Sequence, residues 1–195
     1  MDQPARQLTR GRHRSSAGVS LVEMMSALMI LAIVTAAAFS LYWSGNQAHR
    51  RSRFYSQAQT EARTALREVT RVVRTSVAVV GTGTQGTLSG LTSGANQLIV
   101  RVPSGGASTL EVRYYVANGI LYVQRSDESA PGRELILGVT GLSFAYYRTL
   151  AGTRTAVNGA PGTATEVQVT LQVRRVSVTT GLTAYVAIRT AVSGS

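Results

Sequence analysis

One apolar stretch, residues 19–43, constrains this chain more than any other feature of its sequence. It runs VSLVEMMSALMILAIVTAAAFSLYW, and Glu23 is its only charged residue. As a helix rising about 1.5 Å per residue it would be roughly 37 Å long, which exceeds a hydrocarbon core of about 30 Å. Tyr42 and Trp43 close the stretch with rings that favour the membrane interface. The stretch therefore predicts a transmembrane helix.

A basic segment precedes this stretch and carries Arg6, Arg10, Arg12 and Arg14. The junction Gly18-Val19-Ser20-Leu21-Val22-Glu23 resembles the class III signal of type IV pilins and type II secretion pseudopilins, although that family usually has Phe and Thr where Val19 and Ser20 stand. The resemblance implies that a prepilin peptidase cleaves after Gly18 and methylates the new N-terminus at Val19. It also implies that Glu23 acts in subunit assembly.

The charge of Glu23 has a physical consequence of its own. An unpaired carboxylate inside a membrane span costs on the order of 3 kcal/mol. After cleavage, the α-amine of Val19 on one subunit could pair with Glu23 of a parallel neighbour, which would fix the register between the two helices. The alternative is that Glu23 stays at the headgroup level, because it lies only five residues into the span.

Topology and processing leave one further alternative. Basic residues before the span predict a cytoplasmic N-terminus, although Arg50, Arg51 and Arg53 follow its other end. Ala36-Ala37-Ala38 could instead be an ordinary secretory cleavage site that releases a protein beginning at Phe39. The prepilin interpretation is favoured because the apolar run continues past that site. It implies a single-pass protein of the bacterial inner membrane, with its C-terminal domain outside, that later enters a pilus or pseudopilus.

An amphipathic helix is predicted beyond the span, and with it one long helix from about residue 20 to 79. Gly45 lies at its weakest point. Apolar residues recur at spacings of three and four: Phe54, Ala58, Ala62, Ala65, Leu66, Val69, Val72, Val73 and Val77. Four arginines occupy the opposite side: Arg63, Arg67, Arg71 and Arg74. This basic stripe is interpreted as a solvated face, with nucleic-acid contact as the alternative.

The segment 81–95 is rich in Gly and Thr and ends the predicted helix. It contains a formal GxGxxG at Gly81, Gly83 and Gly86. Dinucleotide binding requires a strand before this pattern and a helix after it, whereas here a helix precedes and strands follow. We therefore expect a flexible connection.

The remaining residues predict an antiparallel sheet. Strands are expected at 97–102, 109–117, 120–125, 134–139, 142–148, 166–174 and 182–191, with a type I′ turn at Asn118-Gly119 and a surface loop over 149–165. The fold class is α+β, with the long N-terminal helix packed across the sheet in a pilin-like manner. The predicted parts are a leader (1–18), a transmembrane helix (19–43), its amphipathic continuation (44–80), a connection (81–95) and a sheet domain (96–195).

Composition bears on the class of function. The formal net charge is +11, every basic residue other than the two histidines is Arg, and there is no Cys. Both histidines, His13 and His49, precede the sheet domain, and the adjacent carboxylates Asp127-Glu128 are too few to hold calcium. We therefore expect no enzyme activity, no metal and no cofactor.

A second resemblance refines the expected function. The runs LILGVTGLSFAYY, EVQVTLQV and VAIRT are similar to the C-terminal half of minor pseudopilins of the type II secretion J kind and of W-type minor pilins. This implies a structural subunit of a filament-priming or tip complex, with other pilin-like subunits and the inner-membrane assembly platform as partners. The alternative is a DNA-binding minor pilin of an uptake pilus, in which arginines lie beside the pairs Tyr114-Tyr115 and Tyr146-Tyr147. Alternation of the strands directs one ring of each pair into the core.

Overall fold

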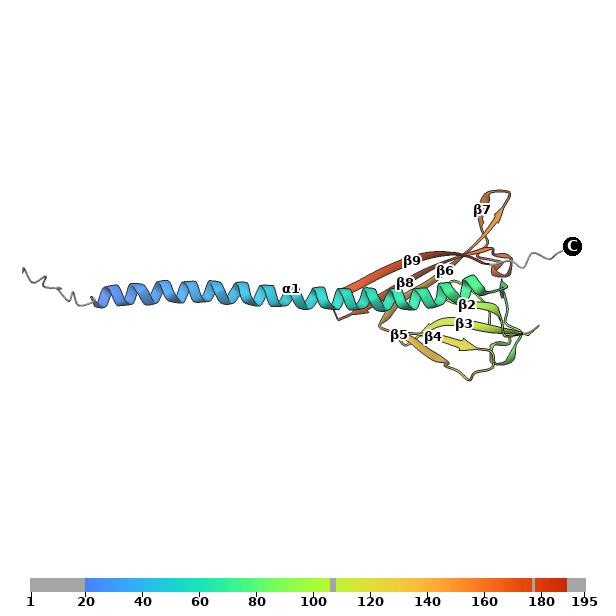
Figure 1. Cartoon of the computed structure of the whole chain (residues 1–195), viewed down its shortest axis with the longest axis horizontal. Helices are drawn as coiled ribbons and strands as arrows, with labels where there is room; N and C mark the ends of the chain where they lie inside the picture. The colour runs from blue at the N-terminus through green and yellow to red at the C-terminus, as the bar shows by residue number, and fades with distance from the viewer. Residues whose placement is uncertain (1–19, 106–107, 177, 189–195) are drawn as a thin grey trace, which may run out of the picture. The chain divides into compact units, whose positions relative to one another are not determined.

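The computed structural model describes residues 20–105, 108–176 and 178–188. The chain divides into two compact units, Met1–Gln47 and Ala48–Ser195. Helix α1 (Leu21–Thr75) contributes to both units and continues through Gly45 without a break (Figure 1). The second unit contains every strand found among the described residues and is called the β unit below. The predicted α+β class, with a long apolar N-terminal helix and antiparallel sheets, is confirmed.

The β unit contains two antiparallel sheets where the sequence predicted one. The first sheet has the order β1-β2-β3-β4-β5, and the second has the order β7-β6-β8-β9. The strands are β1 (Ala78–Val79), β2 (Gln97–Pro103), β3 (Thr109–Ala117), β4 (Ile120–Arg125), β5 (Arg133–Leu137), β6 (Val139–Leu150), β7 (Thr153–Ala156), β8 (Glu166–Arg175) and β9 (Val178–Ala187). Short 3-10 helices lie at Gly86–Leu88 (η1) and Pro161–Thr163 (η2).

Gly138 divides the expected strand 134–139 between the two sheets. Its φ is +77°, and a Cβ at this position would lie 2.5 Å from the Arg174 carbonyl oxygen. Residues before it continue β5, while Val139 begins β6 and pairs with Val173 of β8. The chain therefore passes from the first sheet to the second at a glycine that no other residue could replace without strain.

One core joins the helix to both sheets. The buried stripe of α1 follows the predicted spacing and consists of Ala58, Ala62, Ala65, Leu66, Val69 and Val73. It packs with inward residues of the first sheet, such as Leu98 and Leu121, and of the second, such as Val169 and Leu171. Glu61 binds Arg175 of β8, and Glu68 binds Arg133 of β5. Within the β unit, an ion pair thus links α1 to each sheet at the edge of this core.

Several predicted boundaries shift. The helix ends at Thr75 because the Val77 N–H donates to the Arg101 carbonyl oxygen at 2.8 Å, and Ala78–Val79 then pair with β2. The last strand is Val178–Ala187, so the prediction of 182–191 was too late along the chain; residues 189–191 lie outside those described. The region 149–165 is also not a plain loop, because it contains β7 and η2.

The turn at Asn118-Gly119 is confirmed. Ala117 pairs directly with Ile120, and the two central residues have φ values of 52° and 72°. Two successive positive φ values define the type I′ geometry that Asn-Gly favours. This turn fixes the register of β3 and β4.

Candidate functional site

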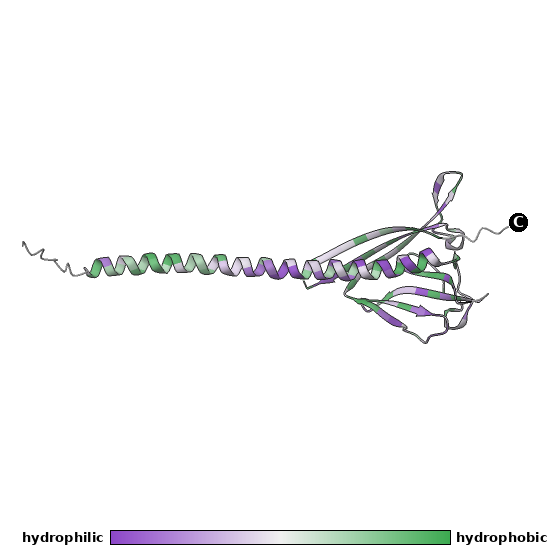
Figure 2. Cartoon of the chain, in the orientation of Figure 1, coloured by the Kyte–Doolittle hydropathy of each residue, from purple (hydrophilic) through white to green (hydrophobic). Residues whose placement is uncertain are grey.

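The apolar segment of α1 has no buried residue between Leu21 and Trp43. Figure 2 shows hydrophobic residues dominating this first part of the helix. Met29, Ile33 and Leu41 expose 73%, 69% and 75% of their surface. By length and composition, α1 could cross a membrane. A signal sequence near the N-terminus has the same length and composition. So continuous an apolar surface requires lipid or other helices around it.

Glu23 lies in the first turn of α1 and is exposed. The positive end of the helix dipole favours a carboxylate at this position. The Ser26 hydroxyl donates to the backbone carbonyl oxygen of Glu23 at 2.9 Å and not to its carboxylate. Within residues 20–105, 108–176 and 178–188, no cation pairs with that carboxylate. The predicted cleavage site, Gly18 and Val19, lies outside the described residues.

Comparison with protein families identifies this segment. Residues 13–39 match the family model of the prokaryotic N-terminal methylation motif. The chain carries a type IV pilin-like prepilin segment. No curated protein matches the chain.

The prepilin segment implies processing by a prepilin peptidase and assembly with other pilin subunits. Its matched range includes Ala36-Ala37-Ala38, which favours the prepilin interpretation over an ordinary secretory cleavage there. Together with the single N-terminal apolar helix, the match fits a membrane-anchored protein of the pilin or pseudopilin type.

The four arginines of the basic stripe share one face of α1. At about 100° per residue they lie within an arc of about 80°, and all four are exposed: Arg63, Arg67, Arg71 and Arg74. Arg71 forms an ion pair with Glu68 at 3.0 Å, and it alone among the four has an acidic partner in the described part of the chain. The stripe exists as predicted, but one of its charges is already matched.

The two tyrosine pairs also follow the predicted alternation. Tyr114 and Tyr146 are buried, while their neighbours lie on the opposite faces of the sheets. The Arg113 guanidinium lies 3.9 Å from the centre of the Tyr115 ring, and the Arg154 guanidinium lies 3.7 Å from that of Tyr147. These rings are therefore already occupied by internal cation–π contacts, which reduces their value as free stacking platforms for nucleic acid.

The segment 81–95 was predicted as a flexible connection, and this was wrong. Leu88 is fully buried against Val80 and Ile99. A Cβ on Gly83 would lie 2.2 Å from the Leu88 carbonyl oxygen, and one on Gly86 would lie 2.0 Å from the Ser126 carbonyl oxygen. These glycines of the GxGxxG pattern therefore serve close backbone packing in a closed loop.

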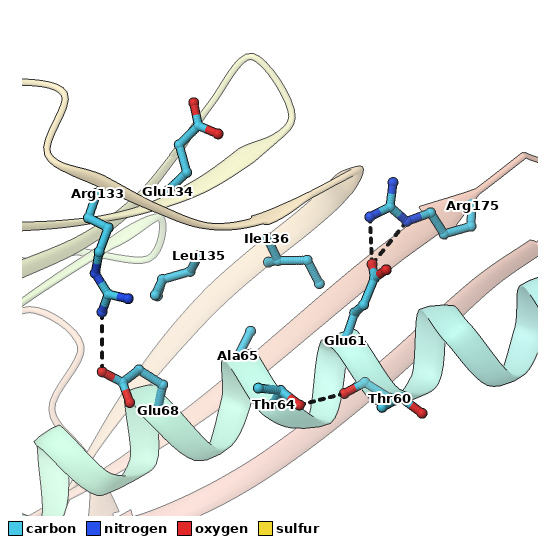
Figure 3. A pocket seen from close by; sticks show the side chains of 10 residues that line it. All are labelled: Thr60, Glu61, Thr64, Ala65, Glu68, Arg133, Glu134, Leu135, Ile136 and Arg175. Carbon is cyan, nitrogen blue, oxygen red and sulfur yellow. Dashed lines mark hydrogen bonds and ion pairs between the residues drawn. The ribbon is translucent and has the colours of Figure 1, made fainter.

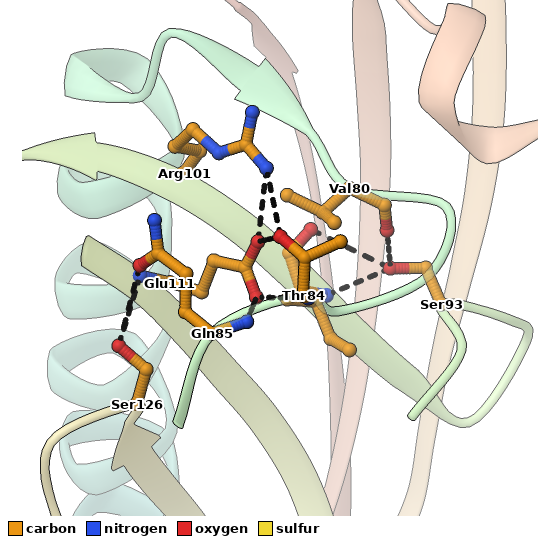
Figure 4. A network of polar contacts seen from close by, with 8 residues as sticks. Val80, Thr84, Gln85, Ser93, Arg101, Glu111 and Ser126 are labelled. Carbon is orange, nitrogen blue, oxygen red and sulfur yellow. Dashed lines mark hydrogen bonds and ion pairs between the residues drawn. The ribbon is translucent and has the colours of Figure 1, made fainter. Parts of the chain in front are cut away.

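Glu111 of β3 holds this loop in place (Figure 4). Its Oε2 accepts hydrogen bonds from the backbone N–H groups of Thr84 and Gln85 at 2.9 and 3.1 Å. Its Oε1 accepts from the Thr84 hydroxyl and from Arg101 Nη2, both at 2.9 Å. Burial by itself raises the pKa of Glu111, but these donors, with Arg101 foremost, outweigh it and hold the pKa below its ordinary value.

Sequence reasoning did not find the Glu111 network. The alternation of β3 places Glu111 on the face opposite Tyr114. A charged residue on that face predicts that the face is exposed to solvent. The signal that could have revealed the network was the combination of one carboxylate on that face with a neighbouring loop rich in Thr and Gly, which offers many backbone donors.

Asp127 and Glu128 lie in the turn after β4. Arg125 pairs with Asp127 at 3.2 Å, and the Arg125 N–H donates to Glu128 Oε2 at 3.3 Å. Both carboxylates are thus engaged by the same arginine. Across the described ranges of the chain, no group of three or more His, Asp or Glu side chains lies close enough to hold a metal ion.

Proposed function

We propose that this protein is a non-catalytic structural subunit, a minor pseudopilin or minor pilin, of a type II secretion or type IV pilus machine. The observation that carries the proposal is the prepilin segment with its fully exposed apolar surface and its single carboxylate at Glu23. The segment is too apolar to remain in water and offers nothing for catalysis. Its chemistry suits lateral packing among similar helices in a membrane and then in a filament.

Glu23 and Val19 would provide the specific contact in that packing. After cleavage, the Val19 amine of an incoming subunit would meet the Glu23 carboxylate of its neighbour. Pairing relieves the desolvation cost of both charges, whereas either charge alone would oppose burial between apolar helices. The pair therefore favours one register of neighbouring helices over all others.

Three finer features belong to the same proposal. Residues 135–147 and 166–173 resemble the J-kind minor pseudopilins and W-type minor pilins, which supports a place in a filament-priming or tip complex. The partners would be the prepilin peptidase, the other pilin-like subunits and the inner-membrane assembly platform. The N-terminus would face the cytoplasm and the β unit the opposite side, with the basic leader favouring that orientation.

The test is site-specific cross-linking in the cell. The chain has no native Cys, so engineered cysteines within residues 24–43 of this protein and of candidate partner pilins report helix contacts without background. We expect Glu23→Gln and Glu23→Val to leave insertion and cleavage intact but to reduce cross-linking strongly. Glu23→Asp, which keeps the charge, should retain part of it.

Thr35→Val is the matched control. It also removes a polar group from the span, but the Thr35 hydroxyl already donates to the Leu31 carbonyl oxygen within its own helix, so cross-linking should persist. Equal cross-linking for wild type and Glu23→Val would refute pairing through Glu23.

A DNA-binding minor pilin is the second candidate. The observation in its favour is the exposed arc of Arg63, Arg67 and Arg74 on α1. The Glu68 carboxylate beside Arg71 and the internal contacts of Tyr115 and Tyr147 weigh against it. The structural subunit is therefore the favoured function.

A further inference from the structure

A groove follows the junction between α1 and the first sheet of the β unit. One cavity of about 530 Å³ lies between α1 and strands β2, β3 and β4. A second, of about 410 Å³, lies between α1 and β5 (Figure 3). Both are lined by Glu68 and Arg133, whose ion pair stands where the two meet. Each volume falls within the range of ordinary ligand pockets.

The larger cavity combines an apolar floor with a charged rim. Its apolar lining, called the floor below, consists of Val72, Val102, Pro103, Leu110, Val112 and Val123. At the rim, the Glu68 carboxylate is shared by Arg71 at 3.0 Å and Arg133 at 3.4 Å. These two side chains expose 71% and 65% of their surface, so both guanidinium groups can turn toward a ligand. Two cations therefore share one anion at this point.

The other charged groups of this cavity do not correct the imbalance. Arg125 pairs with Asp127, and Glu128 accepts a hydrogen bond from the Arg125 backbone. Neither Glu128 nor Glu134, which lines the second cavity, forms an ion pair with Arg71 or Arg133 in the described part of the chain. Among the described residues, Glu68 is thus the one acidic partner that Arg71 and Arg133 share.

Tyr114 supplies an independent indication of a missing partner. It lines the same cavity, its side chain is fully buried, and no hydrogen-bond partner for its hydroxyl occurs in the described part of the protein. A buried hydroxyl without a partner is rare and unfavourable. Burial and the Glu68 carboxylate raise the pKa of Tyr114, whereas Arg133 and Arg71 lower it, which indicates that these three charges lie near the phenol.

We propose that this groove binds an acidic, partly apolar segment of a partner polypeptide. A carboxylate of that segment would accept hydrogen bonds from Arg133, Arg71 and the Tyr114 hydroxyl, and its apolar side chains would cover the floor of the cavity. A second copy of this chain is a poor occupant, because two chains repel each other at a formal charge of +11, or of +8 (16 Arg minus 8 acidic residues) once residues 1–18 are removed. The site lies wholly in the β unit and does not depend on pairing at Glu23.

The test uses the full chain in neutral detergent and a fluorescein-labelled hexapeptide of alternating Leu and Glu, followed by fluorescence anisotropy. The matched probe replaces Glu by Gln, and empty micelles correct for partition into detergent. We expect the Glu peptide to bind at least tenfold more tightly than the Gln peptide. Arg133→Gln should weaken binding of the Glu peptide about tenfold, which corresponds to about 1.4 kcal/mol.

Two further variants separate recognition from folding and from net charge. Tyr114→Phe should weaken binding about fivefold without lowering the urea midpoint of the free chain, because the lost hydroxyl has no native partner. Arg63→Gln removes the same charge from α1 at a position that lines neither cavity, and it should change the affinity by less than twofold.

Three outcomes would overturn the proposal. The first is equal affinity for the Glu and Gln peptides. The second is an equal effect of Arg133→Gln and Arg63→Gln. The third is self-association of the chain that depends on Arg133 and that the Glu peptide does not disrupt, which would assign the groove to a second copy.

Discussion

Removing the Glu111 carboxylate should loosen the loop 81–95 and destabilise the β unit. The side chain is 0% exposed and accepts four hydrogen bonds, one of them from the partly exposed Arg101. Glu111→Ala leaves the part-buried backbone N–H groups of Thr84 and Gln85 without this acceptor, and Arg101 without its anion. Because the freed Arg101 side chain is 36% exposed, water can solvate much of its charge. The cost therefore comes mainly from lost hydrogen bonds to the carboxylate, each worth about 1.5 to 3 kcal/mol, and their loss is a large part of the stability of a single domain.

Glu111→Gln should cost less, for a reason that the geometry supplies. The amide oxygen can still accept from the Thr84 and Gln85 N–H groups at the position of Oε2. The amide nitrogen would then face Arg101, so the charge-assisted bond is lost at a cost of about 1.5 to 3 kcal/mol. Glu134→Gln is the matched control, because Glu134 is exposed on β5 and the change should stay within about 0.5 kcal/mol.

The assay is urea unfolding of the full chain in detergent, followed by the near-ultraviolet circular dichroism of tyrosine at several pH values. The pKa of Glu111 lies below its ordinary value of 4.5 in the folded chain. The contribution of the Glu111 carboxylate to the stability of the folded chain is therefore complete above about pH 4.5. It is lost as the pH falls through the pKa that Glu111 has in the folded chain. The stability gap between wild type and Glu111→Gln should accordingly narrow below that pH. A gap that is absent at pH 7, or that stays constant down to pH 3, would refute this reasoning.

Two further predictions concern processing and the basic stripe. The intact mass of membrane-extracted protein should correspond to a chain beginning at Val19, and Gly18→Ala should slow this processing only in part. A mass that corresponds to a start at Phe39 would support a secretory signal. A mass that corresponds to a start at Met1 would refute the prepilin hypothesis. The stripe consists of Arg63, Arg67, Arg71 and Arg74. Replacing all four arginines by Gln should leave the salt dependence of DNA binding by the full chain unchanged. A clearly flatter dependence would instead assign phosphate contacts to the stripe, through counterion release.

Local patterns predicted much of this fold. The spacing of Ala62, Leu66, Val69 and Val73 depends only on the helical period, and the Asn118-Gly119 turn depends only on two adjacent residues that tolerate positive φ. The chemistry of the prepilin segment is equally local, because six residues between a basic leader and an apolar span carry it. Such features need no knowledge of distant parts of the chain.

Features that depend on distant contacts were not predicted. The division into two sheets at Gly138 follows from its approach to Arg174, which lies in another strand. Alternation within β3 puts Glu111 on the face opposite Tyr114, but alternation cannot indicate that the segment 81–95 covers that face. The groove beside Glu68 likewise arises only when α1 and strands β2 to β5 of the first sheet come together. A periodic pattern identifies the face of an element, whereas the partner of that face is decided by tertiary packing.

The hairpin of β6 and β7 offers a site at which this protein can be labelled. Its two-residue turn consists of Ala151 and Gly152, with φ values of 47° and 82°, and the four residues of β7 are all exposed. A Cβ on Gly152 would meet nothing within 4 Å. Because exposed loop tips tolerate added residues best, an epitope tag or a small fluorogenic peptide inserted between Ala151 and Gly152 would leave the core untouched. Single subunits could then be followed in living cells through a label that avoids both the prepilin segment and the groove.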